Sequence, residues 1–138
     1  MSKSNPLCAS VGATLYIDDV PVFFLDLTGV DKVTARAFYG YNALQSVFVA
    51  NSVTLIERAA FESCGSLTSV EFGDSPGLTV LSRQIFAQCD SLLSIEIPES
   101  VVSLGLEAFR SCTSLTTVVI PGTIGIIPSY AFASCVAL

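Results

Sequence analysis

Four cysteines recur at near-regular intervals from the middle of the chain to its end. They are Cys64, Cys89, Cys112 and Cys135, and the first interval is slightly longer than the other two. Thiols arranged in this way can form disulfides, bind a metal ion, or serve as small buried side chains. The elements that carry the cysteines must be identified before any of these roles is assigned to them.

A second candidate for chemistry is a pair of carboxylates, Glu71 and Glu96, at equivalent positions of this periodicity. Two neighbouring carboxylates can act as acid and base when one pKa is raised. The chain contains no histidine, however, which removes the commonest general base and metal ligand. It also has no glycine-rich phosphate loop and no nucleophile elbow. We therefore expect both glutamates on open sheet without a pocket, and predict no enzymatic activity, no cofactor and no metal site.

Composition and charge exclude further classes of function. The 138 residues suffice for one domain with a substantial core. Although 51% of the residues are apolar, no apolar run approaches the roughly 18 residues of a membrane-spanning helix. The net charge is −6 and there is no basic cluster, which argues against binding to nucleic acids and to anionic membranes. We expect no nucleic-acid partner and no membrane insertion.

The N-terminal segment shows no secretion signal. Its weak apolar stretch is interrupted by Pro6, Ser10 and Gly12, whereas a secretory signal needs about 7 to 15 solidly apolar residues. As written, the chain is expected in the cytoplasm, or at the cell surface or outside the cell if it is a fragment of a longer protein. Cys8 lies apart from the other cysteines and is expected to be a free thiol.

The elements that carry the cysteines are copies of one repeated unit. Phenylalanines recur at a nearly constant interval, and a leucine follows each of them at a fixed offset. The two columns are Phe38, Phe61, Phe86, Phe109 and Phe132, and Leu44, Leu67, Leu92, Leu115 and Leu138. Alternating apolar residues after each leucine predict a short strand. The interval from Phe61 to Phe86 is the longest, because it accommodates two extra residues in the loop 73–77.

The interval between equivalent positions, about 23 residues, lies in the range of leucine-rich repeats. We predict a leucine-rich-repeat solenoid over residues 22–138, with about five units and the last incomplete. Its short parallel strands should form a concave sheet, with helical or 3-10 turns carrying the phenylalanines on the convex side. Residues 1–21 are expected to form an arm and capping segment, with either a hairpin around Asp18–Asp19 or an irregular cap.

Stacking of the repeats favours the buried role for the cysteine column. Neighbouring repeats stack about 5 Å apart, and parallel side chains keep that spacing at Cβ, above the ~3.8 Å usual in disulfides. Metal sites need converging ligands, which a linear column does not provide. Small buried side chains at a crowded turn are therefore favoured, with disulfides and a metal site as the alternatives.

Two stretches resemble the BspA-like subclass of leucine-rich repeats. They are SLLSIEIPESVVSLGLEAFRSC (91–112) and SLTTVVIPGTIGIIPSYAFASC (114–135), and the resemblance extends over residues 22–138. Departures are Ile85 in place of alanine, Tyr41 in place of cysteine, and the insertion at 73–77. The resemblance implies the solenoid fold. It also implies the kind of role that such proteins often have, as surface-exposed adhesins or ligand-binding modules of host-associated bacteria and parasitic protists.

Strand alternation identifies the side chains that should face outward on the concave sheet. They are Phe24, Asp26, Ser46, Phe48, Ser69, Glu71, Ser94, Glu96, Thr117 and Val119. Large exposed apolar groups beside acids often mark contacts. We therefore predict a non-enzymatic module that binds a protein partner through this face. The alternative is a structural fragment that self-associates through its C-terminal edge, since the last repeat lacks a polar cap.

Overall fold

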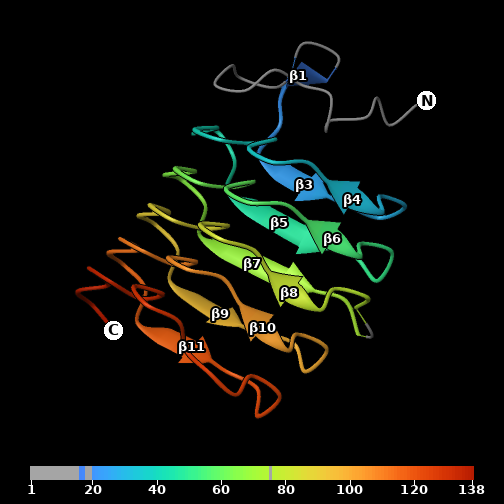
Figure 1. Ribbon diagram of the computed structural model, residues 1–138. Helices are drawn as coiled ribbons and strands as arrows, with labels where there is room; N and C mark the ends of the chain where they lie inside the picture. The colour runs from blue at the N-terminus through green and yellow to red at the C-terminus, as the bar shows by residue number, and fades with distance from the viewer. Residues whose placement is uncertain (1–15, 18–19, 75) are drawn as a thin grey trace.

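The computed structural model describes residues 16–17, 20–74 and 76–138, in which successive repeats stack side by side along one axis (Figure 1). Four of the five main strands begin two residues after a leucine that opens a repeat. The main strands are β3 (Phe24–Asp26), β5 (Ser46–Val49), β7 (Ser69–Phe72), β9 (Ser94–Glu96) and β11 (Thr117–Val119). The strand pairs β3–β5, β5–β7 and β9–β11 are parallel. A backbone hydrogen bond of 3.4 Å from Leu93 to Thr68 links the repeats of β9 and β7.

A second column of two-residue strands lies beyond the ends of the main strands (Figure 1). It consists of β4 (Lys32–Val33), β6 (Leu55–Ile56), β8 (Val80–Leu81) and β10 (Ser103–Leu104). The pairs β4–β6 and β8–β10 are also parallel. The prediction of a solenoid with short parallel sheets is confirmed.

At the N-terminal end, β1 (Tyr16–Ile17) pairs antiparallel with β2 (Val20–Pro21). This is the pairing expected of the predicted hairpin. The remainder of the predicted arm and capping segment, with Cys8 and Asp18–Asp19, lies outside the described residues.

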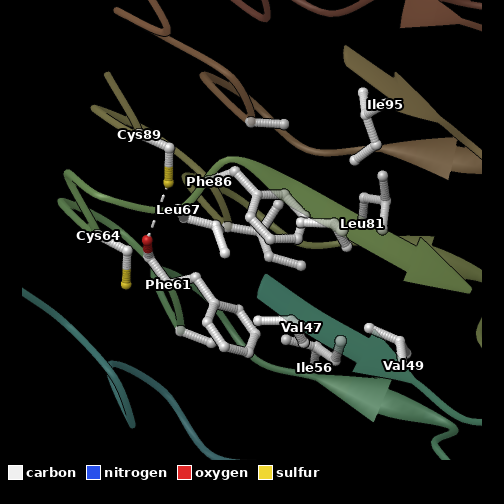
Figure 2. Packing of buried hydrophobic residues seen from close by; sticks show 14 of the residues in the cluster. Val47, Val49, Ile56, Phe61, Cys64, Leu67, Leu81, Phe86, Cys89 and Ile95 are labelled. Atoms are coloured by element: carbon white, nitrogen blue, oxygen red, sulfur yellow. Dashed lines mark hydrogen bonds between the residues drawn. The ribbon is translucent and has the colours of Figure 1, made fainter. Parts of the chain in front are cut away.

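The core is a set of columns in which each repeat buries the same side chains as its neighbour. The phenylalanine rings stack face to face at centroid distances of 5.3, 5.6, 5.7 and 5.4 Å along the chain. The leucines that precede the main strands, Leu44, Leu67, Leu92 and Leu115, are fully buried. Figure 2 shows Phe61 and Phe86 packed toward Ile56 and Leu81 of the second strand column. Each repeat therefore covers apolar surface that a single repeat would expose to water.

The predicted helical turns on the convex side are wrong. The segments that carry the phenylalanines are successive turns, and the described residues contain no helix. The described part of the chain therefore has no helix that could span a membrane. The reason is that two residues in each turn adopt the left-handed conformation, such as Ala59 (φ 56°) and Ser63 (φ 62°). A right-handed helix cannot continue through such residues.

Backbone hydrogen bonds of these turns alternate between two directions. Ala59, Phe61 and Ser63 donate their N–H groups to the following repeat, at distances of 2.9, 3.0 and 2.8 Å. The N–H group of Glu62 donates to the carbonyl of Ala59, and that of Cys64 donates to the carbonyl of Phe61, within the same turn. The same pattern occurs in the other turns, so the convex side is joined by a ladder in which every inter-repeat donor points toward the C-terminal neighbour.

Candidate functional site

The ten residues predicted to face outward lie in two rows across the main strands, and we call this surface the strand face. The first row pairs Phe24 with Ser46 and Ser46 with Ser69, and further along Ser94 with Thr117. The second row pairs Asp26 with Phe48, Phe48 with Glu71, and Glu96 with Val119. The structure thus brings together all ten residues, while their role in binding stays a prediction.

Exposure differs along the strand face. Phe24 and Val119 are 57% and 48% exposed, and exposed apolar side chains can mark contacts where they gather on one surface. Phe48, predicted to be exposed, is half-buried together with Ser46 and Ser69. The ends of the face therefore offer apolar side chains to solvent, and its centre is a partly recessed mixture of aromatic and hydroxyl groups.

A groove of about 900 Å³ adjoins the strand face between the repeats of β7 and β9. Its lining consists of Val70, Glu71, Phe72, Gly73, Asp74, Pro76, Glu96, Pro98, Glu99 and Ser100. The sequence-based expectation of an open sheet without a pocket is therefore wrong at Glu71 and Glu96. Gly73, Asp74 and Pro76, which belong to the segment with the two extra residues, line the groove and account for the difference. Sequence reasoning missed Asp74 and Glu99, although the longer interval marked the place.

Among the described residues, no lysine or arginine forms an ion pair with a carboxylate of the groove. The described residues form three ion pairs: Lys32 with Glu57 at 3.6 Å, Arg83 with Glu107 at 3.6 Å, and Arg110 with Glu107 at 2.7 Å. All of these residues except Lys32 lie outside the strands, and Lys32 belongs to β4 in the second column. In the described part of the chain, no ion pair reaches the groove.

The cysteine column serves as a set of hydrogen-bond donors. The Sγ atoms of Cys64, Cys89 and Cys112 each lie 3.2 Å from the carbonyl oxygen of the phenylalanine one repeat earlier, and that of Cys135 lies 3.0 Å from its equivalent. Figure 2 shows this bond from Cys89 to Phe61. All four are free thiols, and three are fully buried.

Burial also sets the acidity of these thiols. It raises the pKa of Cys64 and of Cys112 to about 12, and raises the pKa of Cys89 well above its ordinary value. The described residues contain no group of three side chains that could hold a metal ion. Thiols that stay protonated are poor nucleophiles. The interpretation of the column as small buried side chains, rather than as disulfides or a metal site, therefore fits its geometry.

The last turn of the chain contains backbone N–H groups at the positions that, in the earlier turns, donate hydrogen bonds to the next repeat. Tyr130, Phe132 and Ser134 occupy the positions whose N–H groups donate to the next repeat elsewhere. Ile126 and Val136, which lie before and after these three residues, are 80% and 81% exposed. This surface therefore combines aligned donors with apolar side chains.

Solved structures similar to this chain are bacterial leucine-rich-repeat proteins. A leucine-rich cell surface protein from Faecalibacterium prausnitzii shares 34% sequence identity with a TM-score of 0.81, over 86% of this chain and 31% of that one. The leucine-rich-repeat protein of Treponema pallidum shares 35% identity with a TM-score of 0.71, over 88% of this chain and 52% of that one. This chain thus spans about a third to a half of the length of these relatives.

More distant matches support the fold alone. A leucine-rich-repeat protein from Eubacterium ventriosum has a TM-score of 0.73 at 21% identity, over 89% of this chain and 39% of that one. None of the curated proteins compared with the chain matches it.

The family model for the BspA type leucine rich repeat region matches residues 25–138 in six copies. The chain therefore belongs to the BspA-type leucine-rich-repeat family.

Proposed function

We propose that the chain is a non-enzymatic, adhesion-type module that binds a protein partner through the strand face. The observation that carries this proposal is that Phe24 and Val119 of the strand face are about half exposed, beside exposed Asp26, Glu71 and Glu96. Protein interfaces are enriched in aromatic side chains surrounded by polar ones. The two rows of the strand face have this composition.

The similarity to a protein described as a leucine-rich cell surface protein supports the same proposal. A surface protein of this architecture meets other proteins through residues that vary between repeats, because the repeated residues are used for stacking. On the strand face the second row varies most, because it contains both acids and apolar side chains, whereas the first row carries a hydroxyl group at every position after Phe24.

The experiment is a binding screen of the purified chain against immobilised extracellular-matrix and cell-surface proteins by biolayer interferometry. The test variant is Phe24→Ser combined with Phe48→Ser. The matched control is Val102→Ser combined with Leu106→Ser, which changes two exposed apolar side chains outside the main strands. We expect the test variant to lose binding by about tenfold or more, as for central aromatic contacts, and the control to retain it. Equal binding by the two variants contradicts the proposal.

A second candidate is self-association through the last turn, favoured by the exposed apolar side chains of Ile126 and Val136. Another copy that packs against this turn would cover both side chains.

Light scattering across a concentration series tests this candidate. If self-association occurs, Ile126→Lys combined with Val136→Lys lowers the average mass at high concentration, whereas Val102→Lys leaves it unchanged. A chain that is monomeric at all concentrations contradicts it.

A further inference from the structure

We propose that the strand face and its groove bind an extended protein segment rich in arginine and lysine. This inference rests on the proposed function, because it assigns the chemistry of the partner to the same surface. It is carried by three features of the structure: the distribution of charge, the shape of the groove, and the apolar and hydroxyl side chains that flank it.

The charges of the molecule are segregated with respect to the strand face. Every cation among the described residues lies outside both the main strands and the groove: Lys32, Arg36, Arg58, Arg83 and Arg110. The main strands and the groove together carry the carboxylates of Asp26, Glu71, Asp74, Glu96 and Glu99. A surface of one sign attracts partners of the opposite sign and steers their approach.

The groove holds its carboxylates on two adjacent repeats. Glu71 belongs to β7 and Glu96 to β9, and Asp74 and Glu99 lie on the segments that follow these strands. β7 and β9 belong to two separate sheets, and the backbone hydrogen bond from Leu93 to Thr68 links their repeats. Like charges on neighbouring repeats repel each other. A guanidinium or ammonium group between two such carboxylates would relieve the repulsion and form charge-assisted hydrogen bonds.

The surroundings of the groove favour a polypeptide over a small polycation. Phe72 lines the groove, and Phe48 lies beside Glu71 in the strand register. The planar guanidinium of arginine stacks on aromatic rings, which an ammonium group does less well. Beside the groove, the hydroxyl groups of Ser69 and Ser94 in the first row of the strand face can hydrogen-bond to an extended backbone. A free polyamine would use the carboxylates but neither the aromatic rings nor these hydroxyl groups.

The test measures fluorescence anisotropy with labelled octapeptides that alternate glycine with arginine, lysine or glutamate. The chain is compared with the variant E71Q/E96Q and with the control D31N/D90N, which removes the same charge from two exposed positions outside the main strands. We expect the arginine peptide to bind most tightly and E71Q/E96Q to weaken it about tenfold, with no change in the control. Raising the salt from about 0.05 to 0.5 M should also weaken binding, because the screening length shortens.

Four outcomes overturn the inference: no binding of the arginine peptide, equal weakening by both variants, tighter binding of the glutamate peptide, or equal competition by spermine and by the unlabelled arginine peptide. If E71Q/E96Q does not fold, as judged by circular dichroism, the salt dependence and the peptide comparison on the unmodified chain still decide. If Phe24→Ser with Phe48→Ser abolishes binding of a protein partner while E71Q/E96Q does not, the strand face is a binding site but its partner is not basic. The proposed function and this inference thus fail separately.

Discussion

At the scale of single residues, the thiols of the cysteine column are donors within the core. Each thiol proton is directed at a phenylalanine carbonyl of the preceding repeat, as with Cys64 and Phe38. The same carbonyl of Phe38 also accepts the N–H of Tyr41. Because a carbonyl has two lone pairs, the thiol occupies the remaining one and ties two repeats together at a fully buried position.

The raised pKa values of these thiols predict a loss of stability in alkali. The unfolded chain releases its thiol protons near pH 9, whereas folded Cys64 and Cys112 hold theirs up to a pKa of about 12. Their contribution to the free energy of unfolding is therefore complete below pH 9 and is lost as the pH rises toward 12. Urea denaturation from about pH 8 to pH 11 should show a smaller alkaline loss for Cys64→Ala combined with Cys112→Ala than for the unmodified chain. An equal loss would mean that other groups cause it.

At the scale of elements, the repeat spacing predicted the strands and their inward side chains well, because alternation and a fixed period leave a single register. It did not predict the convex turns. Ala59 and Glu107 adopt the left-handed conformation, which is unfavourable for residues with a Cβ atom and has no signature in their type. The groove was missed because the longer interval marks an insertion but does not show which of its residues, such as Asp74, line the space between two repeats.

Close contact between elements makes Gly105 a sensitive position. A Cβ atom at Gly105 would lie 2.4 Å from the backbone nitrogen of Arg83 in the neighbouring repeat, whereas a Cβ at Gly125 would meet nothing within 4 Å. We expect Gly105→Ala to lower the free energy of unfolding by about 2 kcal/mol through overpacking, and Gly125→Ala to change it by less than about 0.5 kcal/mol. Urea denaturation measures both, and similar values would show that the repeats can move apart at little cost.

At the scale of the whole molecule, stability is distributed over a stack in which each repeat contacts its neighbours. Such arrays behave approximately as one-dimensional systems, with terms for each repeat and for each interface. The phenylalanine column contributes to every interface, and its rings are nearly parallel, with interplanar angles from 2° to 18°. A change in the middle of the stack should therefore affect two interfaces, and a change at the end only one.

This reasoning separates Phe86 from Phe132. Phe86 is fully buried between Phe61 and Phe109, whereas Phe132 is half-buried and stacks on one ring. We expect Phe86→Ala to lower the free energy of unfolding by about 3–5 kcal/mol, and Phe132→Ala to lower it by roughly half as much or less. Hydrogen exchange should show loss of protection on both sides of Phe86. Equal effects of the two substitutions would contradict a stack of independent interfaces.

The one-way ladder of the convex turns has a consequence for synthesis. In every backbone–backbone hydrogen bond of this ladder the donor lies in the earlier repeat and the acceptor in the later one. As the chain leaves the ribosome, each completed turn already presents its amide hydrogens toward the sequence that emerges next. Contacts along this ladder join segments that are only one repeat apart in the sequence, and short separations favour fast folding. Growth from the N-terminus can therefore proceed one turn at a time, with each new repeat captured by the one made before it.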